Sequence, residues 1–402
     1  MTSEWHEVPL RELVGYISKG IAPSYAEEAS ETTIRVLNQK CNRNFRISYG
    51  DSRLHDTLKK KVPPERYVKP DDILINSTGA GTAGRIAQIE DVPSATTIDG
   101  HMILIRSNGK VTQKFLGYAL KAHQWEVLQL DEGSTGQTEL NRDRLLDEIM
   151  INYPVSFDEQ NAIVGTLESI DRKLIVNEQL NDNLEQQAQA IYHERFETIS
   201  PNDLPSEWRI VTLGEVATIS SKSFNPLKEP EILLEHYSIP AFDEARFPVF
   251  ELSTSIKSNK FIIDASCFMI SKLNPTTKRV WKPYCLTGNA VCSTEFIVYK
   301  AKDKTITDFL YSVIDGNSFS DFMCSHVTGS TGSRQRTTPS DTLSYELILP
   351  SEDELAKFQS LVSPMYAQIR INAIENDRLK RLRDSLLPKL MSGEIDVSTI
   401  QL

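Results

Sequence analysis

The side chains best suited to chemistry are basic and amide residues gathered in two stretches. The first, CNRNFR at 41–46, interleaves asparagine, arginine and phenylalanine, and the second, KLNPTTKRVWK at 272–282, adds lysine and tryptophan to that mixture. Arginine and lysine can contact guanine edges or phosphates, and asparagine can read adenine. Any one of these residues alone is more simply a solvated surface charge, whereas their clustering favours a nucleic-acid interface.

Charge is distributed unevenly along the chain. The net charge is −11, which by itself disfavours binding to nucleic acid. Residues 31–70 nevertheless hold ten Lys/Arg against four Asp/Glu, residues 256–282 hold six against one, and residues 156–200 hold three against nine. Two basic segments are therefore separated by an acidic one, with chance fluctuation in short windows as the alternative.

A phosphate-binding loop is the one cofactor motif that the sequence offers. Gly79, Gly81 and Gly84 match GxGxxG after an apolar strand, and Asp99 follows at a suitable distance. That motif requires a helix after the glycines, but RIAQIE at 85–90 alternates like a strand. A glycine-rich hairpin is the favoured interpretation.

Other catalytic motifs are missing from the sequence. It contains no GxSxG, HExxH or P-loop, and Asn152-Tyr153-Pro154 only partly matches the signature of amino-group methyltransferases. The five cysteines form no CxxC pair, which disfavours a zinc site or a disulfide framework and fits a reducing cytoplasm. No secretory signal or membrane span is predicted. These absences favour a binding protein over an enzyme.

The chain contains an internal duplication. EWHEVPLRELVGYIS at 4–18 and EWRIVTLGEVATIS at 207–220 share a tryptophan and a leucine five residues later. STGQTELNRDRLLDEIMINYP at 134–154 and STGSRQRTTPSDTLSYELILP at 330–350 share their first three residues and a proline after the same gap. Each half is predicted as short strands with Gly, Pro and Asn turns, followed by a helix.

The two helical segments carry matching stripes at spacings of three and four, a pattern typical of a coiled-coil seam. The stripes keep a constant offset of 195 and consist of Ile163, Leu167, Ile170, Leu174, Asn177, Asn181, Leu184, Ala188 and Ile191 in the first copy, and Phe358, Val362, Met365, Ile369, Asn372, Asn376, Leu379, Arg383 and Leu386 in the second. An ordinary amphipathic helix with surface asparagines is the alternative. Helices of roughly 35–40 residues and about 55 Å are expected.

An antiparallel register would satisfy the asparagines of the seam. Residue numbers that sum to 553 pair Asn177 with Asn376 and Asn181 with Asn372, and Leu174 with Leu379. Each amide then has an amide partner, which offsets the cost of burying it, and a buried asparagine specifies register. The predicted fold is α+β: two duplicated strand-rich domains joined by a long antiparallel two-helix coiled coil with pseudo-two-fold symmetry.

The chain resembles the specificity subunits of type I restriction-modification systems of bacteria and archaea. The resemblance is carried by the paired EW starts, the DILIN and CFMISKLNP strands, the Ser-Thr-Gly frames, the segment 153–196 and the ending LRDSLLPKLMSGEIDVS at 382–398. The second half departs from it with SEDELAKFQ at 351–359, which lacks the Glu-Gln pair of SFDEQNAIV.

The resemblance implies four regions: target-recognition domain 1 at 1–153, a central spacer helix at 154–200, target-recognition domain 2 at 201–350 and a C-terminal spacer helix at 351–402. It implies a cytoplasmic, non-catalytic protein that reads one half of a bipartite double-stranded DNA target with each domain. It also implies two modification subunits that methylate adenine with S-adenosylmethionine, and two motor-nuclease restriction subunits that use ATP and Mg²⁺. No cofactor is expected in this chain.

The predicted DNA-contacting residues lie in loops of both halves. They are Lys40, Arg43, Arg46, Ser77, Thr78, Arg85 and Gln137 in the first half, and Lys272, Asn274, Lys278, Arg279, Arg334 and Arg336 in the second. A single-chain DNA methyltransferase or restriction enzyme with its own catalytic site is the first alternative, and S-adenosylmethionine binding would reveal it. A scaffold that binds only proteins is the second, and it would lack a salt-dependent affinity for DNA.

Overall fold

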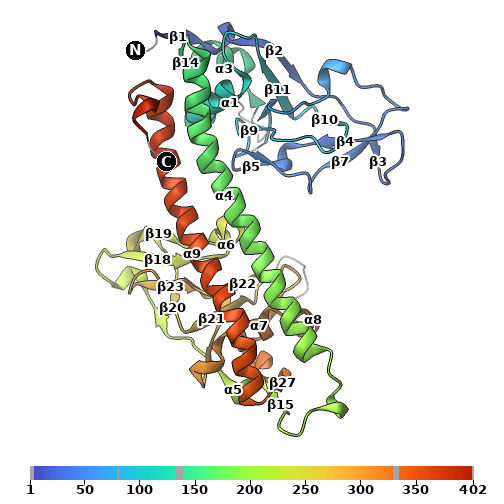
Figure 1. The fold of residues 1–402 in the computed structure, drawn as a ribbon, viewed down its shortest axis with the longest axis vertical. Helices are drawn as coiled ribbons and strands as arrows, with labels where there is room; N and C mark the ends of the chain where they lie inside the picture. The colour runs from blue at the N-terminus through green and yellow to red at the C-terminus, as the bar shows by residue number, and fades with distance from the viewer. Residues whose placement is uncertain (1–3, 80, 133–138, 329–334, 401–402) are drawn as a thin grey trace. The chain divides into compact units, whose positions relative to one another are not determined.

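The chain folds as two units that each mix strands and helices (Figure 1). The computed structural model describes residues 4–79, 81–132, 139–328 and 335–400. Unit 1 consists of Met1–Lys173 and Lys380–Leu402, and unit 2 of Leu174–Leu379. The α+β class is confirmed, whereas the four domain boundaries and the two-fold relation expected from the sequence stay predictions.

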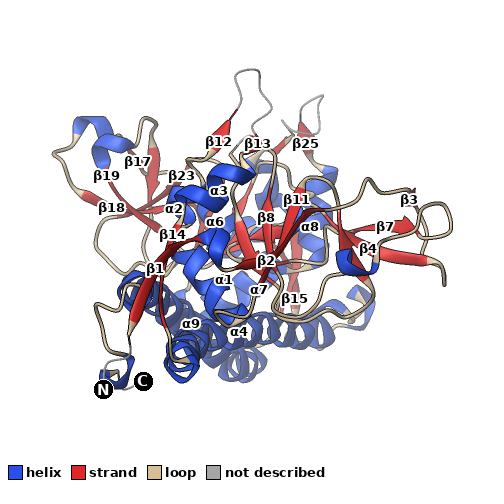
Figure 2. Cartoon of the chain, turned by 90° about the horizontal axis from the view of Figure 1, so that it is seen from above, coloured by secondary structure: helices blue, strands red, loops and turns tan. Residues whose placement is uncertain are grey.

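Unit 1 is built on a four-stranded antiparallel sheet with the order β2-β11-β8-β9. Its strands are β2 (Val14–Lys19), β11 (Met102–Ser107), β8 (Ile73–Asn76) and β9 (Ile86–Gln88), and Figure 2 shows β2, β11 and β8 side by side. All four residues of β8 are buried, which explains why Ile73, Leu74 and Ile75 form an apolar run rather than an alternation. Helix α1 (Gln113–Ala122) packs its apolar side into the same core.

A second sheet in unit 1 has the order β10-β4-β7-β3 and contains one parallel pair, β10 with β4. Its strands are β10 (Thr96–Ile98), β4 (Thr33–Leu37), β7 (Arg53–Asp56) and β3 (Tyr25–Ala26). A separate antiparallel pair joins the start of the unit to the strand before the long helix. It consists of β1 (Trp5–Pro9) and β14 (Met150–Pro154).

Unit 2 repeats the order of the main sheet, which confirms the predicted duplication, whereas its second sheet has five strands where that of unit 1 has four. Its first sheet has the order β16-β24-β21-β22, formed by Ala217–Ile219, Phe296–Ala301, Cys267–Ser271 and Val280–Trp281. Its second sheet again contains one parallel pair, β18 (Leu233–Tyr237) with β23 (Ala290–Ser293). The pair β15 (Arg209–Thr212) and β27 (Glu346–Leu349) corresponds to β1 and β14.

Two long helices supply part of each core. Helix α4 (Phe157–Tyr192) has 36 residues and α9 (Glu352–Met391) has 40, close to the predicted lengths. Ile163 and Leu167 are buried in the core of unit 1, and Phe358 and Val362 in that of unit 2. Among the described residues, no helix combines the length and apolar character that a bilayer crossing requires.

The two long helices begin with different contacts. In α4, the buried Gln160 donates from Nε2 to the Pro154 carbonyl (2.9 Å) and accepts the Thr112 backbone N–H at the start of α1 (2.8 Å). In α9 the matching position is Leu355, which is buried in the apolar core of unit 2. An apolar contact therefore replaces the amide contact where the second half lacks the Glu-Gln pair.

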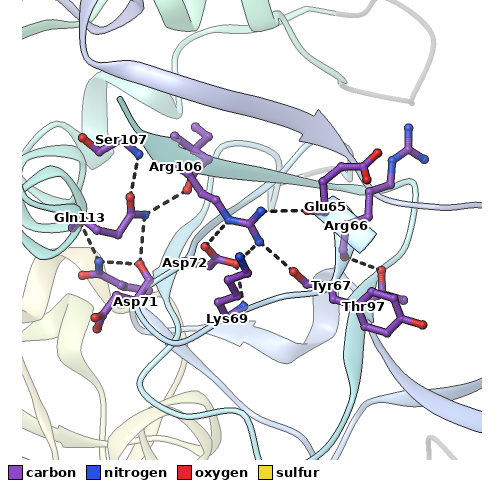
Figure 3. A network of polar contacts seen from close by, with 12 residues as sticks. Glu65, Arg66, Tyr67, Lys69, Asp71, Asp72, Thr97, Arg106, Ser107 and Gln113 are labelled. Atoms are coloured by element: carbon purple, nitrogen blue, oxygen red, sulfur yellow. Dashed lines mark hydrogen bonds and ion pairs between the residues drawn. The ribbon is translucent and has the colours of Figure 1, made fainter. Parts of the chain in front are cut away.

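A polar network fixes the segment that leads into β8 (Figure 3). Arg106 on β11 binds both carboxylate oxygens of Asp72 at 2.7 Å and donates to the carbonyls of Glu65 (2.9 Å) and Tyr67 (2.8 Å). Gln113 on α1 donates to the Asp71 carbonyl at 3.1 Å. The network therefore ties the loop before β8 both to β11 and to the start of α1.

Candidate nucleic-acid interface

A two-stranded hairpin presents the first basic stretch. Strands β5 (Asn42–Arg43) and β6 (Arg46–Ile47) pair antiparallel with Arg43 opposite Arg46, so these two side chains lie on one face of the hairpin. The turn residues Asn44 and Phe45 both have left-handed backbones, with φ of 51° and 62°. Positive φ at both central residues is what a type I′ turn requires. We call residues 42–47 the basic hairpin.

The opposite face of the basic hairpin is attached to the main sheet of unit 1. Asn42 is buried, and its Nδ2 donates to the Arg85 carbonyl (2.8 Å) and to Oδ1 of Asn76 (3.2 Å). Phe45 forms an isolated parallel bridge with Ala87 on β9. Arg85 is thereby placed beside the hairpin although it is about forty residues away in sequence.

The glycine-rich loop is a β-hairpin turn, as the sequence favoured. Gly79 and Gly84 have φ of 115° and 84°, and the chain continues directly into β9, which pairs with β8. No helix follows the glycines, so the arrangement of a dinucleotide-binding fold is lacking here. Gln124 holds the turn by donating from Nε2 to the Gly84 carbonyl (2.8 Å) and accepting the Ile86 N–H (2.9 Å).

The structure brings most of the predicted residues of the first half together. Asn76 Nδ2 donates to the Gln39 carbonyl (3.2 Å), which places the exposed Lys40 next to the end of β8. Ser77 and Thr78 follow on the same strand end, where Thr78 Oγ1 lies 2.8 Å from His101 Nδ1. Gln137 lies outside the described residues. The gathered set is Lys40, Arg43, Arg46, Ser77, Thr78 and Arg85.

The second basic stretch forms a loop braced by the segment that follows the second Ser-Thr-Gly frame. The Asn274 N–H donates to the Gln335 carbonyl (2.9 Å), and the Thr337 N–H donates to the Lys272 carbonyl (3.1 Å). Arg336 is thereby brought to this loop, where it binds both carboxylate oxygens of Glu295 at 3.0 and 3.2 Å. Arg334 lies outside the described residues.

Arg279 and Lys278, like Arg336, have strong partners within the chain. Arg279 binds Asp243 through two hydrogen bonds of 2.6 and 2.8 Å, and its side chain is only 13% exposed. Lys278 pairs with Asp315 at 2.8 Å. These pairs hold the loop against α6 (Ile239–Ala245) and α7 (Thr307–Asp315). DNA would therefore have to compete with Asp243 for Arg279 and with Asp315 for Lys278. The contacts described include no ion-pair partner for Lys272.

An ionic cluster joins α1 to both long helices within unit 1. Asp171 on α4 accepts from Lys121 Nζ (3.0 Å), Arg383 Nη1 (2.9 Å) and the Tyr118 hydroxyl (2.9 Å). Burial lowers the pKa of Lys121. Burial opposes ionisation of Asp171 too, but Lys121 and Arg383 outweigh it and hold the pKa of Asp171 below its usual range. The cluster is therefore held together by a charged carboxylate and not by a protonated, neutral one.

The predicted asparagine pairs are present in unit 2. Asn177 Nδ2 donates to Asn376 Oδ1 at 2.8 Å, and Asn372 Nδ2 donates to Asn181 Oδ1 at 2.8 Å. These pairs require that α4 and α9 run antiparallel with residue numbers summing to 553. Asn177, Asn372 and Asn376 are buried, so the amides satisfy one another away from water. That they specify the register stays a prediction.

Several residues of this region were missed by the sequence analysis. Lys19 forms an ion pair with Glu139, and Glu139 bridges to Thr78 next to the glycine-rich turn. Trp125 is 74% exposed on α2 (Gln124–Val127), the short helix that holds the turn. The contacts of Lys19 and Glu139 join segments far apart in the sequence and therefore left no signal in it, whereas the tryptophan itself could have been noted. Within the ranges described, no group of three or more His, Cys, Asp or Glu side chains could hold a metal ion.

Comparison with known proteins shows similarity to type I restriction-modification specificity subunits. Residues 2–186 match the model of the type I restriction modification DNA specificity domain. The chain is 25% identical, over 384 residues, to the specificity subunit of the type I restriction enzyme MjaIX from Methanocaldococcus jannaschii, covering 88% of this chain and 84% of that protein. Residues 2–186 are thus similar to a type I specificity domain, and the chain over most of its length is similar to a type I specificity subunit.

Two further similarities are one short sequence match and one shared fold. A 93-residue segment, 23% of this chain and 20% of the relative, is 33% identical to the specificity subunit of the type I restriction enzyme HindI from Haemophilus influenzae. The crystal structure of a type I restriction-modification S subunit from M. genitalium shares the fold, with a TM-score of 0.58 at 16% identity over 97% of this chain and 99% of that one.

Proposed function

We propose that the chain is the non-catalytic DNA-specificity subunit of a type I restriction-modification complex. The recognition domain at 1–153 reads one half of a bipartite DNA target, and the domain at 201–350 reads the other. The basic hairpin and the turn after β8 contact DNA for the first domain. The loop at 272–279, braced by Arg336, does so for the second.

One observation carries this proposal: segments far apart in sequence converge on one basic surface in unit 1. The hairpin at 42–47, the strand end at 76–78 and the turn residues 81–85 are tied together by Asn42 and Asn76. Unit 2 repeats the order of the main sheet and again places basic residues on the loops after the matching strand, β21. Basic loops on a duplicated fold suit two half-sites on one DNA duplex.

The partners follow from the same proposal. Two modification subunits dock on the long helices and methylate adenine with S-adenosylmethionine, and two restriction subunits add ATP- and Mg²⁺-dependent cleavage. Relatives of this chain bear the names of type I restriction enzyme specificity subunits, which supports assembly with such partners. The chain itself then works in the cytoplasm without a cofactor.

Mapping of methylated adenines tests the proposal. The full chain is co-expressed with the modification subunit of its own system, and genomic DNA is sequenced for methylation. A bipartite motif with a fixed gap is expected. Arg43→Ala should relax one half of the motif and Lys272→Ala the other, since each lost base contact costs roughly 1–3 kcal/mol.

Lys110→Ala is the matched control, because Lys110 lies on the surface past the far end of β11 from the β8–β9 turn and should leave the motif intact. A continuous motif, or none, would contradict the proposal. S-adenosylmethionine binding by the purified chain would favour a single-chain methyltransferase instead.

A further inference from the structure

Phe45 has an unusual backbone for a large aromatic residue. Its φ of 62° follows that of Asn44 at 51°, and both form the turn of the basic hairpin. Asparagine tolerates this left-handed conformation, whereas phenylalanine seldom adopts it because its Cβ crowds the backbone. Such a conformation persists where surrounding contacts determine it, and it gathers at functional sites.

The Phe45 ring is partly buried. It packs against the core of unit 1 and lies with its centre 5.0 Å from Nζ of Lys121 on α1. The Phe45 carbonyl accepts the Gln88 N–H on β9 at 3.4 Å. The turn is thus held on one side by the sheet and on the other by a cation–π contact with α1.

Lys121 continues this contact to the long helices. Its side chain is 10% exposed, and its ammonium group lies 3.0 Å from Asp171 on α4, which also binds Arg383 on α9. A chain of direct contacts therefore runs from the tip of the basic hairpin through α1 to both long helices of unit 1. Unit 2 has helix α6 between β18 and β19 (Val249–Leu252), where unit 1 has the hairpin between β4 and β7.

We propose that Phe45 is a positioning residue that acts through Lys121. It fixes the basic hairpin to the long helices and thereby sets which bases Arg43 and Arg46 reach. This inference rests on the proposed DNA-reading function and deepens it. Because α6 replaces the hairpin in unit 2, the effect belongs to one half of the target alone.

The test uses the full chain co-expressed with its modification subunit and a library of randomised duplex DNA. The variants are Phe45→Leu, Lys121→Met and the double variant, with Phe45→Tyr as the conservative replacement and Lys110→Met as the surface control. Phe45→Leu should lower discrimination at the bases of one half-site by roughly tenfold and leave the other half unchanged. Phe45→Tyr and Lys110→Met should retain the wild-type motif.

The double variant tests whether the two residues act together. If Phe45 works through Lys121, the double variant should lose no more discrimination than the stronger single variant, because effects on one linkage are not additive. Additive losses would overturn the linkage. An equal loss at both half-sites would overturn positioning too, since general instability affects the whole chain. Thermal melting shows whether Phe45→Leu is folded. If it is not, the loss of discrimination in Lys121→Met at one half-site tests the positioning role by itself.

Failure of this inference differs from failure of the proposed function. A wild-type bipartite motif that persists in Phe45→Leu and Lys121→Met would overturn the positioning role and leave the proposed function standing. A wild-type complex without any bipartite motif would overturn the proposed function itself.

Discussion

At the residue scale, the amide pairs between the long helices combine burial with mutual hydrogen bonding. Asn177 and Asn376 are buried in unit 2 and share a hydrogen bond, and Asn177 also donates to Glu375 at 2.7 Å. A buried amide that loses its partner keeps the full cost of leaving water. The pair is therefore more sensitive to loss of one member than to loss of both.

Replacement of one amide should destabilise the protein more than replacement of both. Asn177→Ala is expected to cost about 1–3 kcal/mol, whereas Asn177→Leu with Asn376→Leu should be close to neutral or stabilising. The midpoint of urea unfolding of the full chain measures both. Asn183→Ala, at an exposed position of α4, should stay within about 0.5 kcal/mol. A double variant weaker than the single one would contradict this account.

Two arginines of unit 1 form bidentate pairs with aspartate, one buried and one exposed. Arg106 and Asp72 have side chains 18% and 4% exposed, whereas Arg11 and Asp147 are 51% and 55% exposed. Lysine keeps the charge but lacks the planar fork that binds two oxygens and two carbonyls at once. We therefore expect Arg106→Lys to lower the free energy of unfolding by about 2 kcal/mol.

Arg11→Lys is the control for that prediction. An exposed ion pair contributes about 0–1 kcal/mol, so its loss should hardly move the unfolding midpoint. Equal effects of the two substitutions would show that burial does not distinguish the pairs.

The sequence shows which residues are basic, but it could not predict which of them form ion pairs within the folded chain. Arg279 and Asp243 are 36 positions apart and meet only because α6 packs beside the loop. The left-handed backbone of Phe45 was equally unpredictable, because local preference at that turn position favours glycine. Tertiary contacts decide both.

At the element scale, the helices were the most predictable part of the chain. Their repeat of three and four depends on local geometry, so their lengths, antiparallel direction and amide register followed from the sequence alone. The sheet orders did not, because strands such as β4 and β10 are joined by long-range pairing that no short pattern encodes. The duplication predicted two similar strand-rich domains and gave neither sheet order.

The attachment of α1 to the long helices should depend on pH. The pKa of Asp171 is lower in the folded chain than its unfolded value of about 3.9, so its contribution to stability is present above that pH and is lost as the pH falls through the lower folded pKa. Asp171→Asn should cost about 3–5 kcal/mol at pH 7, because Lys121 and Arg383 lose the buried carboxylate that they share.

That difference should shrink as the pH falls below about 3.9, because the unfolded wild-type chain then binds a proton at Asp171 that the folded chain does not. Unfolding midpoints at pH 7, 5 and 3 measure the change. Asp384→Asn is the control: Asp384 also binds Arg383, but its side chain is 63% exposed, and its loss should have little effect at any pH. A constant difference for Asp171→Asn across pH would contradict the assignment.

At the scale of the whole molecule, an acidic protein is proposed to bind a polyanion. The net charge of −11 repels DNA in general, so binding depends on the local basic loops of each unit. Contacts to phosphate release counterions, which makes affinity fall steeply with salt. The target bases themselves could not be predicted, since the groove edge that each side chain reaches depends on the geometry of the complex.

Salt titration should separate the contributions of the two units. Lys40→Ala and Lys272→Ala should each reduce the slope of log affinity against log salt by about 1, and the double variant by about 2. Fluorescence anisotropy of a labelled duplex with the full chain and its modification subunit measures the slopes. Unchanged slopes would show that neither lysine contacts phosphate.

The division of the chain into units has a consequence for its synthesis. Unit 2 is continuous in sequence, but unit 1 is completed by residues 380–402, where Leu387, Leu390 and Met391 enter its core and Gly393 lies against the Trp5 ring. At roughly 5–20 residues per second, a ribosome needs about 10–40 s to translate the stretch between the two pieces. During that time the first piece waits as a nascent chain with an open apolar edge, and the second unit can finish folding before the first.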